Sequence, residues 1–295
     1  MKFALFVLLI AFAGSYSAAG VPATLPSAED GQIEFERMSR LIRAMGAARD
    51  LEGLRSLAER IQAEWADRSA GAYGQLMFEV VGELSSRQFD DPRQYELMWQ
   101  WGVRAMERAE QMPLALQADL VRFVQADPKA SADAWPQRRG QTIALKFQVW
   151  KRIHDAVDQA WDADRDYPRG VPLPPGVGSR AGITDPKQRQ EYDAAVAQYR
   201  QQAARWSLQR DLRNLEPQIA QDTERAAIWA YSQQPPALGE LRSLLGQYVA
   251  DEAARARILK EAQAHLQPAD GARRAPPQPP LEERLRQRRL EGAAP

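Results

Sequence analysis

The chain has 295 residues and a mass of 33.2 kDa, enough to bury a sizeable core in one large domain or two small ones. Its 39 Lys and Arg balance its 39 Asp and Glu, so it lacks the basic excess of a dedicated nucleic-acid-binding protein. The absence of Cys excludes disulfides, thiol nucleophiles and thiolate metal sites, and two His are too few for a three-histidine zinc site.

Residues 1–19 predict a cleavable secretory signal peptide. Lys2 gives a positive start, residues 3–13 are apolar, and Ser17 and Ala19 fit the small-residue rule for cleavage after Ala19. As a helix, the apolar run would span ~17 Å, too short for a bilayer core of about 30 Å. We therefore expect an exported protein, periplasmic or secreted, without stable membrane insertion after cleavage. The alternative is a retained N-terminal membrane anchor.

Residues 27–165 carry apolar residues at the three-and-four spacing that is typical of amphipathic helices. The stripes run over Ile33–Met45, Leu51–Trp65, Tyr73–Leu84, Tyr95–Met106, Leu116–Val124 and Ile143–Trp161. They predict an N-terminal helical domain. Trp99 and Trp101 point about 200° apart on such a helix, so either that helix lies between neighbours or one ring is exposed for a partner.

Residues 166–184 interrupt the helical pattern. Residues 167–182 contain four Pro and four Gly and show no apolar period. This composition predicts a linker between two helical parts, or else a surface loop folded back on one domain.

Residues 185–267 predict a smaller, C-terminal helical domain. Thr184 or Asp185 is a suitable cap for a helix that begins at Pro186. A seam with coiled-coil-like spacing follows at Tyr192, Val196, Tyr199, Ala203 and Trp206. Because Pro217 would clash with the carbonyl of Arg213, we expect a break or kink near residues 214–216. Two short helices should complete this part.

Residues 268–295 form a basic tail with six Pro, six Arg and four acidic residues. It has too few large apolar residues to offset its ordering entropy, so we expect disorder, with room for a short helix over Leu281–Leu290. Its arginines could dock on an acidic partner or an anionic surface, or the tail could simply be solvated.

The whole pattern predicts an all-α fold. Antiparallel helical hairpins would form an irregular bundle or a short α-solenoid, followed by the smaller helical part and the disordered tail. No segment shows convincing strand alternation, and no position carries the tetratricopeptide signature.

Two residues are weak candidates for catalysis. Glu83 stands among Val80, Val81 and Leu84, and an apolar setting favours the protonated carboxyl of a glycosidase general acid. His154 is followed four residues later by Asp158, which could orient its ring on a helix; a surface ion pair is the plainer interpretation.

Motifs for metals and cofactors are incomplete. Asp162, Asp164 and Asp166 alternate like the start of a calcium loop, but Tyr167 and Leu173 stand where Gly and Glu are needed. We therefore predict no metal and no cofactor.

With no catalytic motif, we expect a non-enzymatic protein that mediates protein–protein interaction in the cell envelope or the extracellular space. Its partner would be a protein and not a nucleic acid; the partner's identity and the oligomeric state stay open. The alternative is a cell-envelope glycan hydrolase that uses a single Glu as general acid.

Overall fold

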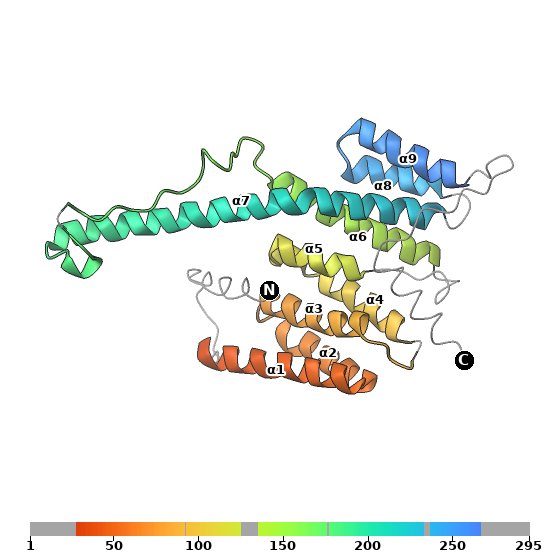
Figure 1. The fold of residues 1–295 in the computed structure, drawn as a ribbon. Helices are drawn as coiled ribbons and strands as arrows, with labels where there is room; N and C mark the ends of the chain where they lie inside the picture. The colour runs from red at the N-terminus through yellow and green to blue at the C-terminus, as the bar shows by residue number, and fades with distance from the viewer. Residues whose placement is uncertain (1–27, 92, 125–134, 176, 233–236, 267–295) are drawn as a thin grey trace, which may run out of the picture. The chain divides into compact units, whose positions relative to one another are not determined.

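A computed structural model shows the chain as a series of helices (Figure 1). It describes residues 28–91, 93–124, 135–175, 177–232 and 237–266. The α-helices are α1 (Ala28–Ala48), α2 (Leu51–Trp65), α3 (Ala70–Ser86), α4 (Arg93–Met106), α5 (Leu114–Phe123), α6 (Trp135–Ala156), α7 (Pro186–Ser232), α8 (Leu238–Tyr248) and α9 (Glu252–Leu266). Two 3₁₀ turns lie at Ala109–Gln111 and Arg180–Gly182. The described residues contain no strand, which confirms the all-α prediction.

The chain divides into two units, residues 1–37 and residues 38–295. The described part of the first unit is the N-terminal half of α1. All other helices belong to the second unit. The predicted signal peptide and basic tail lie outside the described residues, and the predicted division into domains at 165 and 185 stays a prediction.

Helices of the second unit contact mainly their next and next-but-one neighbours along the chain. Contacts of the first kind join α2 with α3, α3 with α4, α5 with α6, and α6 with α7. Contacts of the second kind join α3 with α5, α6 with α8, and α7 with α9. This local pattern is typical of stacked helical hairpins, as the sequence predicts.

Local chemistry determines where the first hairpin turns. Arg49 has a φ of 56° and ends α1 in the left-handed region, with the Asp50 amide donating to the Met45 carbonyl at 3.0 Å. Asp50 then caps α2, because its carboxylate accepts from the Gly53 amide at 2.8 Å. The chain therefore reverses within two residues.

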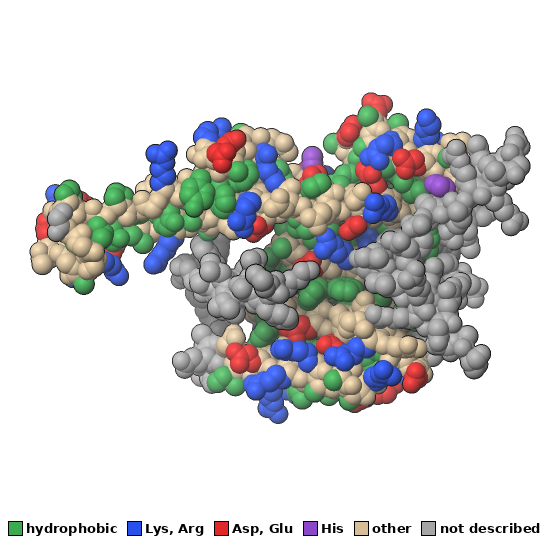
Figure 2. Space-filling model, viewed as in Figure 1, with side chains coloured by type: hydrophobic (Ala, Val, Ile, Leu, Met, Phe, Trp, Pro, Cys, Tyr) green, Lys and Arg blue, Asp and Glu red, His purple; other side chains and the backbone are tan. Residues whose placement is uncertain are grey.

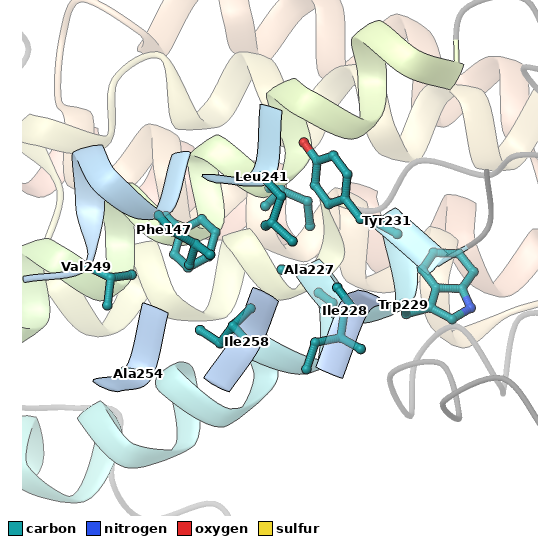
Figure 3. Close-up of a cluster of buried hydrophobic side chains, with 14 residues drawn as sticks. Phe147, Ala227, Ile228, Trp229, Tyr231, Leu241, Val249, Ala254 and Ile258 are labelled. Carbon is teal, nitrogen blue, oxygen red and sulfur yellow. The ribbon is translucent and has the colours of Figure 1, made fainter. Parts of the chain in front are cut away.

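Within the part of the chain that the structure describes, the apolar stripes form two buried clusters. The first is built on α3, whose Tyr73, Leu76, Met77, Val80, Val81 and Leu84 are all fully buried. The second lies where α6, α7, α8 and α9 meet, around Phe147, Tyr231, Leu241 and Ile258 (Figure 3). Such packing supplies most of the stability of amphipathic helices in water.

Helix α7 is continuous over 47 residues and includes Pro217. The break predicted near residues 214–216 is therefore wrong, and the kink predicted as its alternative stays a prediction. Buried residues on both sides of the proline, Leu212 at 2% exposure and Ile219 at 1%, anchor both halves of the helix. Nearby, the Gln218 side chain donates to the Asn214 carbonyl at 2.8 Å. Tertiary packing thus outweighs the local cost of proline in a helix.

Candidate interaction surface

The Pro- and Gly-rich segment after α6 lies along the N-terminal half of α7 (Figure 1). Near α6, the Trp206 indole Nε1 donates to the Ala163 carbonyl at 2.9 Å. Near the start of α7, Arg180 forms an ion pair with Asp193 at 2.9 Å. We call residues 158–183 the strap, and the strap together with residues 186–208 of α7 the arm.

Side chains from α7 fix the point at which the chain leaves α6. Gln209 donates from Nε2 to the Ala156 carbonyl at 3.0 Å and accepts from the Asp158 amide at 2.7 Å. Arg213 donates to the Asp158 carbonyl at 2.9 Å. The last carbonyls of a helix need partners from outside it, and α7 supplies them here. Helix α6 therefore ends at Ala156, and the prediction that this helix extends to Trp161 is wrong.

An aromatic cluster fastens the strap to the helix. The Trp161 ring lies 6.1 Å from the ring of Trp206, and Tyr167 meets Trp206 edge-on at 5.2 Å between centroids. Guanidinium groups cover the indoles, Arg213 at 5.4 Å from Trp161 and Arg210 at 5.1 Å from Trp206. These contacts make a small apolar centre away from the two main clusters.

The far end of the strap is also held. Ile183 is buried to 1% exposure, and its carbonyl accepts from the guanidinium of Arg189 at 2.6 Å. Asp185 accepts from the Lys187 amide at 2.9 Å, which confirms the prediction that it caps a helix starting at Pro186. Both ends of the strap are therefore fixed by hydrogen bonds to α7 or its cap.

No residue of α7 between 186 and 208 is buried, and the buried residues of this helix begin at Gln209. The seam that starts at Tyr192 and ends at Trp206 is half-buried. Tyr167 is 60% exposed, and its ring lies beside the Trp206 indole. Figure 2 shows hydrophobic side chains and cationic side chains side by side on the arm. The arm is thus ordered without contributing to the two main apolar clusters.

Two of the three alternating aspartates of the strap, Asp162 and Asp166, accept hydrogen bonds from the strap's own backbone. Asp162 accepts from the amides of Asp164 at 3.1 Å and Arg165 at 2.8 Å. The Arg165 hydrogen bond, helped by the Asp162 amide, lowers the pKa of Asp166 to about 2. Among the described residues, no group of three or more His, Asp or Glu is placed to hold a metal ion.

Glu83 lies in an ion pair. The Nε of Arg87 donates to its carboxylate, whose side chain is 15% exposed. The carboxylate lies against Gly46 of α1, so closely that a side chain at that position would collide with it. This is not the apolar setting that a protonated general acid requires.

His154 contacts α7 and not the aspartate on its own helix. Its Nδ1 lies 3.3 Å from Oε1 of Glu216, which also accepts from the Trp150 indole at 3.4 Å. Because α6 ends before Asp158, that aspartate bonds to the Arg205 guanidinium at 3.0 Å. The structure therefore does not bring His154 and Asp158 together as the helical spacing suggests, and it places His154 in a contact between α6 and α7.

The two tryptophans of α4, Trp99 and Trp101, lie on different faces of the helix. Trp101 is 2% exposed and belongs to the core. Trp99 donates from Nε1 to the Thr142 hydroxyl of α6 at 3.0 Å, and the Arg138 guanidinium lies 4.7 Å from its ring. This helix lies between neighbours, as one of the two interpretations of the sequence requires.

No protein family, curated protein or solved structure matches the chain in comparisons with known proteins. Within the described ranges, every helix is too short or too polar to cross a membrane. The arm is the feature of the described residues that most resembles a binding surface.

Proposed function

We propose that the protein is an exported, non-enzymatic binding protein whose arm contacts another protein in the cell envelope or the extracellular space. The observation that carries this proposal is the arm itself. Twenty-three residues of α7 and the strap beside them are held in one arrangement although none of these helix residues is buried.

The strap is ordered although fixing it costs conformational entropy, and this supports a role for it other than packing in the core. Each residue fixed from a flexible segment costs roughly 1–2 kcal/mol of backbone entropy, and the strap is rich in Gly. Long-range hydrogen bonds from Trp206, Gln209 and Arg213 offset part of that cost, together with the aromatic contacts of the strap. A loop that only joins α6 to α7 could be much shorter than the strap. A recognition surface, by contrast, gains affinity when it is ordered before its partner binds.

The chemistry of the arm suits a protein partner. Tyr, Trp and Arg are the residue types enriched at the energetic centres of interfaces. The arm presents Tyr167 beside Trp206, and Arg210, two residues beyond the arm on α7, lies over the indole. The arm carries six acidic and seven basic residues, so no excess of one sign favours nucleic acid.

A photo-crosslinking experiment tests this function. Tyr167, which is 60% exposed, is replaced by a photoreactive phenylalanine analogue, and Gln221, exposed on the C-terminal half of α7, is replaced in a matched control. The proposal predicts a covalent adduct with one distinct protein of the exported fraction from position 167 and none from position 221. Equal adducts from both positions, or no adduct from either, would contradict it.

A glycan hydrolase that uses Glu83 is the second candidate, with weaker support because of the Arg87 ion pair. Its test is direct. Release of reducing ends from cell-wall glycan by the purified protein, abolished in Glu83→Gln, would favour this function over the first. Absence of such activity in the wild-type protein removes it.

A further inference from the structure

The side of α7 that faces away from Trp206 has a regular pattern of its own. Leu208 lies two residues from Trp206, about 200° around the helix, and is 53% exposed. In steps of three and four the same side carries Lys187, Gln190, Ala194, Ala197, Gln201, Ala204, Leu208 and Asp211, and all eight are exposed. We call these eight residues the outer face.

Alternating steps of three and four are the spacing with which one helix meets another along its length. Charged residues of the outer face stand only at its two ends, Lys187 at the start and Asp211 at the finish. The middle contains Ala194, Ala197 and Ala204, which allow two helix backbones to approach closely. The strap makes its aromatic contacts on the other side of the helix, with Trp206.

We propose that the outer face binds the outer face of a second copy of this chain, with the two helices antiparallel. A two-fold axis between Ala197 and Gln201 sets the register. It places Ala194 opposite Ala204 of the second copy, and Lys187 opposite Asp211 of the second copy. Such an interface is self-complementary, because each contact occurs twice.

Charges beside the outer face agree with this register. Glu191 is exposed near the start of the helix and Arg205 near the end of the arm, so antiparallel pairing places them together across the interface. In the single chain, Arg205 already pairs with Asp158 at 3.0 Å, but its side chain is 71% exposed and a guanidinium has donors for a second carboxylate. The interface would thus contain four ion pairs, two of each kind.

A parallel pairing of the two helices would bring like charges together. It places Lys187 against Lys187 and Asp211 against Asp211 of the second copy, and Arg200 beside Arg205. The antiparallel arrangement retains one like-charge contact, between the two Arg200 side chains near the axis. Charge therefore selects the antiparallel second copy as the occupant of this face.

Sedimentation velocity of the full chain tests the pairing. The wild-type protein should show concentration-dependent dimerisation, and Ala197→Glu, which brings two carboxylates together at the axis, should raise the dimer dissociation constant at least about tenfold. Gln202→Glu is the matched control, because Gln202 is exposed like Ala197 but lies off the outer face. It should leave the dissociation constant unchanged. A wild-type chain that stays monomeric overturns the proposal, and so does a dimer whose dissociation constant is unchanged by Ala197→Glu.

A charge exchange tests the orientation. Lys187→Glu and Asp211→Lys should each weaken the dimer, whereas the double variant should restore it, since each new Glu meets a new Lys only when the helices are antiparallel. Failure of the double variant to restore dimerisation, while its melting temperature equals that of the wild type, contradicts the antiparallel register. This inference does not depend on the proposed function, because it concerns a different side of α7 from Tyr167.

Discussion

At the scale of single residues, burial follows the apolar spacing, whereas polar contacts do not. The stripe on α3 predicts the buried positions of Leu76, Val80 and Leu84, because spacing alone decides which side of a helix is apolar. The partner of His154 is Glu216, sixty-two residues away. No local spacing could indicate that contact, since it depends on how α6 and α7 pack.

Tyr73 carries a residue-scale prediction about pH. Burial, reinforced by the charge of Glu107, raises its pKa to about 12, whereas an unfolded tyrosine titrates near 10. The raised value means that this group's stabilising contribution is complete below pH 10 and is lost as the pH rises through 12. When the pH is raised from 9 to 12, the unfolding free energy of Tyr73→Phe should therefore fall less than that of the wild type, by about 2 kcal/mol.

Urea unfolding at a series of alkaline pH values measures this difference. Tyr167→Phe is the control, because it makes the same chemical change at a side chain that is 60% exposed. Parallel curves for the wild type and Tyr73→Phe would contradict the account of this site.

At the scale of elements, the positions of helices could be predicted better than their ends. The end of α6 depends on Gln209 and Arg213, which come from a helix that begins thirty residues later. The strap could be predicted only as a linker or a folded-back loop, because composition shows flexibility and not what the segment lies against. The unbroken α7 was missed because a local rule for proline takes no account of packing on either side.

Gln209→Leu should loosen the strap. The substitution leaves the Ala156 carbonyl and the Asp158 amide without their partners, and removing such bonds from a buried site costs about 1–3 kcal/mol. Hydrogen exchange at the Asp158 amide should accelerate, while exchange in α3 stays as in the wild type. The exposed Gln202→Leu is the control. Unchanged protection at Asp158 in Gln209→Leu would show that Gln209 does not hold the strap.

Pro217→Ala should stabilise the protein. An alanine restores an amide that can donate to the Arg213 carbonyl and removes the ring, and the expected gain is about 1–3 kcal/mol. The exposed Gln221→Ala, one turn further on, should change little. Chemical unfolding of the two variants measures the difference, and a loss of stability in Pro217→Ala would mean that α7 needs the proline.

At the scale of the whole molecule, the sequence predicts the all-α class but not the arm, the surface proposed to bind a partner. Apolar residues at helical spacing, with no convincing strand alternation, are enough to predict stacked helices. The arm could not be predicted, because it depends on long-range contacts of Trp161, Tyr167 and Trp206. Its place outside the two apolar clusters is what makes it the candidate for binding.

Removal of the arm tests that claim most directly. Trp206 donates to the Ala163 carbonyl at 2.9 Å, so residues 164–205 can be replaced by a short Gly-rich loop without separating the remaining ends. The proteins that co-purify with the full chain are then compared with those that co-purify with the shortened chain, once the two chains are shown to have the same melting temperature. The account predicts that the shortened chain folds and loses its protein partner. A shortened chain that keeps the partner, or one that cannot fold, would contradict it.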